Sequence, residues 1–106
     1  MSRDVNLRLA DMREACDQIL AFVARGGPDW SKDPLFENAV VRCLEVLGEA
    51  AKHVPDEVRA QFPAVPWPRI CGLRDILIHR YFGVDTVLLR SIVDDYVSEL
   101  RRALGA

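Results

Sequence analysis

The side chains best suited to chemistry lie in one short stretch of the chain, from Ile70 to Phe82. His79 follows Arg74 after four intervening residues, and Tyr81 lies two residues beyond His79. A neutral imidazole accepts a proton near neutral pH, and a guanidinium binds a phosphate group through two parallel hydrogen bonds. Together these groups suit the cleavage of RNA without a metal ion, because the ribose 2′-hydroxyl supplies the nucleophile.

The element that positions these residues is a predicted helix from about Pro68 to Arg80. Apolar residues recur there at helical spacing, and a proline suits the first helical position because its missing N–H would be unpaired anyway. On the helical wheel, Arg74 falls inside the apolar arc that contains Leu73 and Leu77. An unpaired buried guanidinium costs several kcal/mol, so we expect Arg74 to be buried with its guanidinium either paired or in reach of water.

A carboxylate and a second guanidinium, Arg80, accompany the histidine on this helix. Asp75 and His79 lie one turn apart, so Asp75 can accept a hydrogen bond from one ring nitrogen and leave the other free. Arg74 and His79 are about 140° apart on the wheel, so a site that uses both needs a long reach or a second copy of the helix. A symmetric dimer would supply that copy.

The predicted second helix carries a polar row of Arg42, Glu45 and Glu49, at spacings of three and four. One interpretation is a solvated face with helix-stabilising ion pairs. The other is that Glu49 pairs with Arg74, while the neighbouring Gly48 lets another helix approach closely. Both interpretations stay open on the sequence.

The motif and its flanking stretches resemble those of HEPN domains. Arg74-x4-His79-x-Tyr81 is similar to the R-x4-6-H signature of these domains, in the R-x4-H-x-Y form of the HepT-like branch. The resemblance covers essentially the whole chain and departs at position 75, where the branch usually has Asn and this chain has Asp. Three further stretches match in the same order: Gly48-Glu49-Ala50, Val65-Pro66-Trp67 and Tyr81-Phe82-Gly83-Val84-Asp85.

The resemblance implies a metal-independent RNA endonuclease, the toxin of a type II/VII-like toxin–antitoxin system. HEPN ribonucleases are understood to assemble their site in a cleft between the two subunits of a homodimer. The resemblance implies no cofactor and no metal ion. The implied roles are catalysis for Arg74 and His79, orientation of the histidine for Asp75, and support for Glu49 and Arg80.

The implied partners are the RNA substrate and a nucleotidyltransferase antitoxin of the MNT type. By resemblance to HepT toxins, the antitoxin would add AMP to Tyr81. Added negative charge and bulk beside Arg74 would then block RNA binding. The alternative for Tyr81 is an aromatic packing residue with a solvated hydroxyl.

Two other function classes stay open. The first is a non-catalytic HEPN module that binds a nucleotide or serves as a scaffold for a nucleotidyltransferase, which Asp75 and the sequence pI of about 5.6 favour. The second is a helical dimerisation protein in which Arg74 and His79 form a polar pair that holds helices in register. Toxicity on expression alone would separate an active ribonuclease from both classes.

Length and composition predict one soluble domain over residues 1–106, half of whose residues are apolar. No run of about 18 apolar residues occurs, so we expect a cytoplasmic protein without a membrane partner. A net charge of -2 gives no overall basic field for nucleic acid, but twelve arginines against two lysines allow a local phosphate-binding patch. The cysteines, odd in number and on predicted apolar faces, are expected to be buried thiols: Cys16, Cys43 and Cys71.

The spacing of apolar residues predicts an all-α, HEPN-like, up-and-down four-helix bundle with one short extra helix. Glycines and prolines separate the predicted helices, and no stretch of the sequence has a pattern that favours a strand over a helix. We expect Trp67 to anchor the start of the motif helix. The predicted helices, in order, run from Val5 to Gly26-Gly27-Pro28, from the Asp33-Pro34 cap to about Val54, from Pro55-Asp56 through Phe62, from Pro68 to Arg80, and from the Asp85 cap to Leu104.

Overall fold

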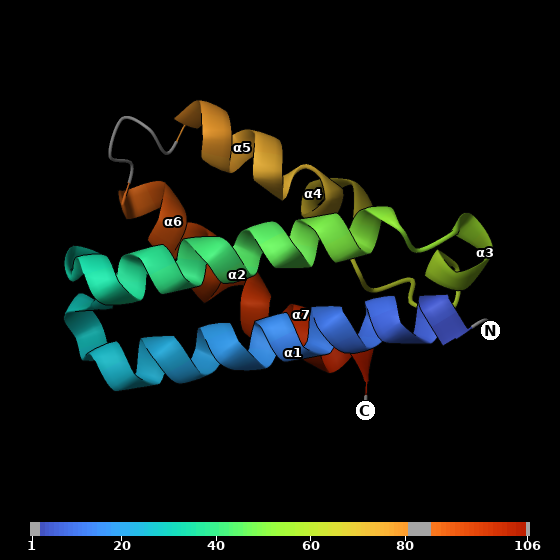
Figure 1. Ribbon diagram of the computed structural model, residues 1–106, viewed down its shortest axis with the longest axis horizontal. Coiled ribbons are helices and arrows are strands. Elements are labelled where there is room, and N and C mark those ends of the chain that lie inside the picture. Colours follow the sequence, from blue (N-terminus) through green and yellow to red (C-terminus); the bar gives the residue numbers. More distant parts are fainter. Residues whose placement is uncertain (1–2, 81–85, 106) are drawn as a thin grey trace.

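The computed structural model describes residues 3–80 and 86–105, with the backbone alone for residues 78–80. All regular elements in this part of the chain are helical, which confirms the predicted all-α class. Figure 1 shows two long antiparallel helices, α1 and α2, with α4 and α5 along one side of α2 and the last helices crossing behind both. Within the described residues, none of the helices has the length and apolar character needed to cross a bilayer.

The two long helices, α1 (Arg3–Gly26) and α2 (Pro34–Lys52), form the largest helix pair of the fold. Both predicted apolar stripes are confirmed, because Leu9, Cys16, Val40 and Leu47 are buried between the helices. Each fully buried leucine contributes about 1.5–3 kcal/mol relative to an exposed one. The matching apolar stripes therefore hold α2 against α1. The motif helix packs on another side of α2.

A short 3-10 helix, η1 (Gly27–Lys32), joins α1 to α2 and seals one end of the core. Trp30 is only 1% exposed and belongs to the hydrophobic core. Asp33 caps α2 by accepting a hydrogen bond from the Leu35 backbone nitrogen at 3.0 Å, and Pro34 follows in the first turn. The predicted cap is therefore correct.

The C-terminal end of α2 is closed by a side chain from the next helix, α3 (Asp56–Arg59). The Arg59 guanidinium donates from Nε to the Val54 carbonyl at 2.8 Å and from Nη2 to the Ala51 carbonyl at 3.1 Å. Its Cζ also lies 5.4 Å from the ring centroid of Trp67, whose Nε1 donates to the Phe62 carbonyl. Trp67 thus anchors the motif helix as predicted. The predicted end of the short helix at Phe62 was wrong, because α3 ends at Arg59, where the chain turns to reach the proline-rich connector.

The predicted motif helix is two helices, α4 (Trp67–Cys71) and α5 (Leu73–Arg80), separated at Gly72. The prediction of one uninterrupted helix was wrong. Gly72 has φ of -84° and ψ of -3°, which ends the first helix with a turn, and the Ile76 nitrogen then donates to the Gly72 carbonyl at 3.1 Å. This backbone conformation is open to any residue and the apolar spacing continues across it, so spacing alone does not reveal the interruption.

The final helical segment is also more varied than predicted, comprising α6 (Thr86–Ile92), η3 (Val93–Val97) and α7 (Ser98–Leu104). Its middle part is a π-helical turn, in which the wider winding rotates the following side chains relative to an α-helix. Tyr96 in this turn accepts a hydrogen bond from Arg69 of α4 at 2.6 Å. The predicted cap residue, Asp85, lies outside the described residues.

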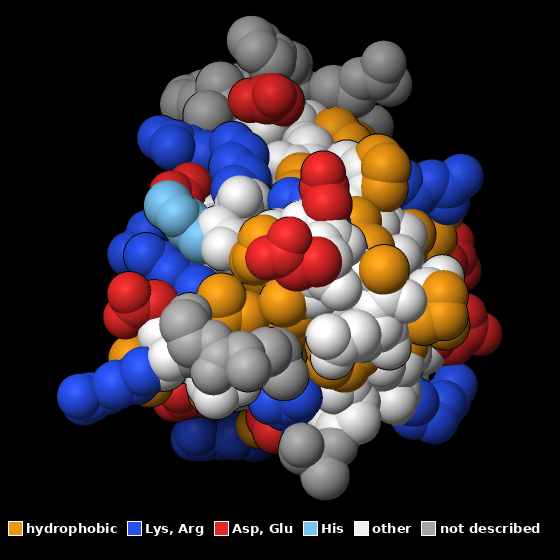
Figure 2. Space-filling view, turned by 90° about the vertical axis from the view of Figure 1, so that its right-hand side faces the viewer, with side chains coloured by type: hydrophobic (Ala, Val, Ile, Leu, Met, Phe, Trp, Pro, Cys, Tyr) orange, Lys and Arg blue, Asp and Glu red, His pale blue; other side chains and the backbone are white. Residues whose placement is uncertain are grey.

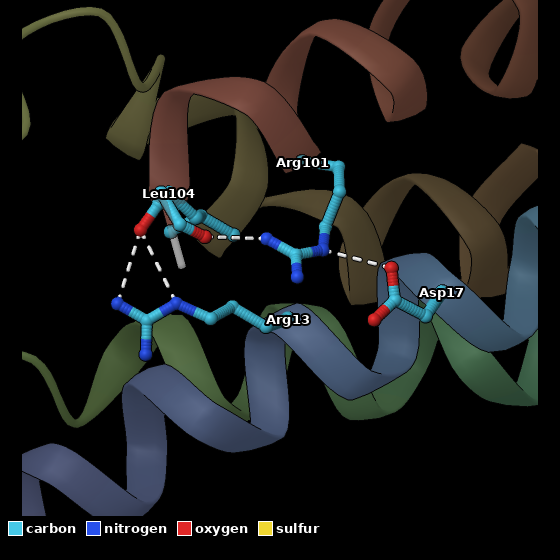
Figure 3. A network of polar contacts seen from close by, with 5 residues as sticks. Arg13, Asp17, Arg101 and Leu104 are labelled. Carbon is cyan, nitrogen blue, oxygen red and sulfur yellow. Dashed lines mark hydrogen bonds and ion pairs between the residues drawn. The ribbon is translucent and has the colours of Figure 1, made fainter.

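Polar contacts fasten the last helix to the first (Figure 3). Arg13 of α1 donates from Nε and Nη2 to the Leu104 carbonyl, at 3.2 and 3.0 Å. Arg101 of α7 donates to Asp17 of α1 at 2.8 Å. Both contacts satisfy or orient groups in the last turns of α7, so this helix is held against the middle of α1.

The cysteines are free thiols, of which Cys16 and Cys43 are buried as predicted and Cys71 is half-buried. Burial raises the pKa of the Cys16 thiol to about 12, against a smaller lowering effect of Arg101. Burial also raises the pKa of Cys43. Cys71 lies beside the Arg59 guanidinium, whose Nη2 is 3.4 Å from its sulfur. The two core thiols are therefore protonated at neutral pH.

Candidate functional site

The place of the motif helix depends on a glycine in α2. A Cβ atom added to Gly48 would lie 3.0 Å from the Ile70 carbonyl oxygen and 3.5 Å from the Leu73 Cβ. The backbone of α4 and the first turn of α5 therefore approach α2 as closely as two helices can. The predicted close approach at Gly48 is confirmed, and it brings Arg74 alongside the residues that follow Gly48.

Arg74 itself is exposed, so the prediction of a buried guanidinium was wrong. The buried stripe is centred on Leu73 and Leu77, and its other flank is the half-buried Ile76. Arg74 lies at the outer edge of this stripe instead of inside it. An exposed guanidinium keeps its hydration and needs no compensating partner within the chain.

The Arg74 side chain lines a cavity of about 260 Å³ between α1, α2 and α5. Its wall combines three guanidinium groups, three carboxylates and two apolar side chains. Figure 2 shows the same mixture of acidic and basic side chains over the end of the bundle where the N-terminus and α3 lie. The residues that line the cavity are Arg8, Asp11, Arg42, Glu45, Val46, Glu49, Ala50 and Arg74.

Two carboxylates of this cavity are already paired along α2. Glu45 lies 3.7 Å from Arg42, and Glu49 lies 3.3 Å from Nε2 of His53, one turn further along. These pairs fit the solvated-face interpretation of the polar row, while the alternative, a pair between Glu49 and Arg74, is absent among the contacts of the described residues. Glu49 nevertheless shares the cavity with Arg74.

The part of the site built on the second half of α5 is described only by its backbone. Asp75 is exposed, and α5 continues through Arg80, so Asp75 and His79 lie one turn apart on the same helix. The side chains of His79 and Arg80 lie outside the described residues, as does the whole of Tyr81. Their contacts with Arg74 stay predictions.

The described residues offer no set of three His, Cys, Asp or Glu side chains placed to hold a metal ion. The cavity does offer the guanidinium of Arg74, which has no ion pair with a carboxylate among the described residues. Carboxylate oxygens that can accept hydrogen bonds line the same cavity. Among the described residues, Arg74 has no acidic group within 4.0 Å. Such a guanidinium can bind a phosphate group, and the carboxylates can accept hydrogen bonds from hydroxyl or amino groups.

Sequence reasoning did not find the α1 side of the cavity. Arg8 and Asp11 lie three residues apart on the polar face of α1, where charged residues usually face solvent. Only the packing of α1 against α2 brings them next to Glu49. Nothing in their own sequence context marks them, since an amphipathic helix carries many such pairs.

Comparison with known proteins covers nearly all of this chain. The model of the family described as "Ribonuclease HepT-like" matches residues 12–106, which include all of the predicted site residues. "Putative RNase MJ1380" of Methanocaldococcus jannaschii is 37% identical over 101 residues, which are 94% of this chain and 93% of that protein. "Probable ribonuclease HepT" of Thermococcus cleftensis is 35% identical over 102 residues, 95% of this chain and 93% of that protein. Comparison with solved structures gave no match.

Proposed function

The chain belongs to the ribonuclease HepT-like family, and we propose that it is an endoribonuclease whose active site is built on α5. Beyond family membership, the observation that carries the proposal is the position of Arg74. Its guanidinium is exposed at a cavity and, within the described residues, has no carboxylate partner. An arginine held in this way is available for the phosphate group of a substrate.

In the proposed reaction, neutral His79 removes the proton from a ribose 2′-hydroxyl. The 2′-oxygen attacks the adjacent phosphorus, the bond from phosphorus to the 5′-oxygen breaks, and the leaving 5′-oxygen takes up a proton from solvent. The products are a 2′,3′-cyclic phosphate and a 5′-hydroxyl. The nucleophile is part of the substrate, so the chemistry needs an acid–base group and charge stabilisation and no metal ion.

Arg74 would stabilise the negative charge that gathers on the phosphate oxygens as the attack proceeds. A donor of this kind typically contributes about 10²- to 10³-fold in rate. Asp75 would orient the His79 ring from one turn away, and Arg80 and Glu49 would support the site. Asp accepts a hydrogen bond from the ring as Asn would, so the departure at position 75 keeps the orienting role.

We place the active site in a cleft between two copies of the chain. Arg74 and His79 are five residues apart in α5, which is about 140° on a helical wheel, so one copy does not readily present both groups to one phosphate. A two-fold pair of α5 helices brings Arg74 of each copy near His79 of the other.

The decisive experiment is RNA incubation with the wild type and with His79→Ala, in the presence of a chelator. We expect the wild type to release fragments with 2′,3′-cyclic phosphate ends, and His79→Ala to release none while it stays folded and keeps its assembly state. Cleavage by His79→Ala at the wild-type rate would overturn the mechanism. Loss of wild-type cleavage on chelation would overturn its metal independence.

The same proposal makes the chain a toxin that a nucleotidyltransferase antitoxin neutralises. AMP added to Tyr81 would place a phosphate near Arg74, where it would compete with RNA for the guanidinium. Coexpression with the neighbouring gene's product should raise the intact mass of the wild type by one AMP or a multiple of it, and should leave Tyr81→Phe unchanged. An unchanged wild-type mass would remove the modification from the proposal.

The balance of charges in the cavity favours one alternative, a non-catalytic module that binds a nucleotide or holds a nucleotidyltransferase. The three carboxylates of Asp11, Glu45 and Glu49 equal in number the three guanidinium groups of the cavity, so the cavity has no net positive charge, and the net charge of the chain is -2. Expression separates the two functions. A ribonuclease should inhibit growth when expressed alone, whereas equal growth of cells with wild type and with Arg74→Ala would favour the module.

A further inference from the structure

A second arginine of the cavity, Arg8, is as free to bind an anion as Arg74. Arg8 is half-buried on α1 and lines the same cavity of about 260 Å³ as Arg74 on α5. Among the contacts of the described residues, neither arginine has a carboxylate within 4.0 Å. The third arginine of the cavity, Arg42, differs because it is paired with Glu45 at 3.7 Å.

The two arginines approach the cavity from opposite sides of α2. Figure 1 shows α1 on one side of α2 and α5 on the other, and both pack against it. A linear polyanion that binds Arg74 and continues across the face of α2 therefore reaches Arg8. Because the two guanidinium groups line one cavity, a polyanion with more than one phosphate can engage both of them.

The carboxylates between the arginines favour a ligand that also donates hydrogen bonds. Asp11, Glu45 and Glu49 line the cavity together with Arg8 and Arg74. A plain phosphate group would be repelled by them, whereas ribose hydroxyls and base amino groups donate to carboxylate oxygens. Single-stranded RNA offers both parts, namely phosphates at intervals and hydrogen-bond donors between them.

We propose that Arg8 binds a non-scissile backbone phosphate of the RNA strand whose scissile phosphate lies at Arg74. This inference rests on the proposed ribonuclease function and names a binding residue for it outside the R-x4-H-x-Y motif. Arg8 touches a phosphate that does not change charge during the reaction. Its contact is therefore equally strong in the ground state and the transition state, so it acts on KM and leaves kcat unchanged.

Arg25 provides a matched control on the same helix. Arg25 is exposed in the last turn of α1, 17 residues beyond Arg8, which is about 25 Å along the helix. Arg8→Gln and Arg25→Gln each remove one positive charge. Only the Arg8 guanidinium lines the cavity. A difference in RNA binding between the two variants therefore reports on the site and cannot come from the change in net charge.

The first measurement is equilibrium binding of a short single-stranded RNA at several salt concentrations, in the His79→Ala background so that the RNA stays intact. The logarithm of the association constant should fall with the logarithm of salt with a slope smaller by about 0.7 in Arg8→Gln, the value for one lost phosphate contact. Binding should weaken by about tenfold at low salt. Arg25→Gln should keep the parent slope and affinity, and Arg8→Lys should restore most of the slope because it restores the charge.

The second measurement is RNA cleavage in the active protein. Arg8→Gln should raise KM by about tenfold and keep kcat within about twofold of the wild type. Separate values of KM and kcat distinguish RNA binding from a structural role. If Arg8 mainly stabilised the fold, its loss would lower the melting temperature and reduce kcat through loss of folded protein. Thermal unfolding of Arg8→Gln and Arg8→Lys, followed by circular dichroism, tests this role directly.

The outcomes separate this inference from the proposed function. Equal salt slopes for Arg8→Gln and Arg25→Gln would overturn the inference, whether or not the wild type cleaves RNA. A wild type that shows the Arg8-dependent slope but releases no fragments would support the inference and overturn the ribonuclease proposal. The absence of RNA binding by every variant would overturn both.

Discussion

The Glu49 carboxylate lies 3.3 Å from Nε2 of His53, the residue that caps the C-terminal end of α2, although Glu49 shares a cavity with Arg74. The pair is about half exposed on both sides. Glu49 is therefore engaged along its own helix, and the Arg74 guanidinium is left without a carboxylate partner among the described residues. The availability of Arg74 for a phosphate group follows from this division of partners.

The Glu49–His53 contact should contribute little to stability. Pairs between exposed residues four apart on a helix contribute about 0.3–0.5 kcal/mol, so Glu49→Gln should change the free energy of unfolding by less than about 0.5 kcal/mol. Urea denaturation at neutral pH measures this, with Glu57→Gln on the exposed surface of α3 as the matched loss of one negative charge. A decrease of more than about 2 kcal/mol in the free energy of unfolding would show that Glu49 makes a stronger interaction than the one with His53.

Arg74→Ala should separate activity from stability. The exposed side chain adds little to the folded state, so the free energy of unfolding should change by less than about 0.5 kcal/mol, while the single-turnover cleavage rate should fall by about 10²- to 10³-fold. Arg74→Lys should recover only part of the rate, because an ammonium group does not reproduce two parallel hydrogen bonds to phosphate. Arg25→Ala should change neither quantity. Intact cleavage by Arg74→Ala would contradict the proposed role.

Gly48→Ala should destabilise the protein. The new Cβ would lie 3.0 Å from the carbonyl oxygen of Ile70, a backbone atom that cannot move without shifting α4. We expect a loss of about 1–3 kcal/mol, reduced by the gain in helix propensity. Thermal or urea unfolding measures it, and a stabilised Gly48→Ala would contradict the close contact.

Gly72→Ala is the matched control for Gly48→Ala. Its Cβ would lie 3.3 Å from the Pro68 carbonyl, one turn back in the same helical segment, and the φ of -84° suits any residue. The cost should therefore be much smaller than at Gly48. Equal losses for both variants would mean that glycine content as such, and not the approach of α4 to α2, determines the effect.

Stability should fall at alkaline pH in a way that depends on Cys16. Burial raises the pKa of this thiol from the ordinary 9.0 to about 12, so its stabilising contribution is complete below pH 9.0 and is lost as the pH rises toward 12. In that window the unfolded state releases the proton first, and the free energy of unfolding should fall by up to about 1.4 kcal/mol per pH unit. Denaturation of wild type and Cys16→Ala between pH 8 and about pH 11 checks this, because the other titrating groups are common to both. Parallel pH profiles would contradict the raised pKa.

Local signals in the sequence predicted the helices well where one physical effect dominates. The cap at Asp33 and Pro34 depends only on a short carboxylate and a fixed backbone angle, and it is correct. The stripes of α1 and α2 follow from burial alone. The interruption at Gly72 and the π-helical turn of η3 were not predicted, because they keep the apolar spacing that marks an uninterrupted helix.

The candidate site was less predictable than the helices because it combines residues from distant segments. The helical wheel placed Arg74 in the apolar arc, but the direction in which α5 packs is decided by the contact at Gly48 and by Ile76. Arg8 became a site candidate only through the cavity that α1 and α2 form with α5. The roles of His79 and Tyr81 stay predictions from the motif and the family.

The contact between Arg13 and the Leu104 carbonyl joins residues that are 91 positions apart in the sequence. During synthesis on the ribosome, α1 has to wait for almost the whole chain before this contact can form. A chain that stops short of α7 leaves both Arg13 and Asp17 without these partners. The bundle is thus completed by α7, so removal of α7 should yield a chain whose first helix is held less firmly.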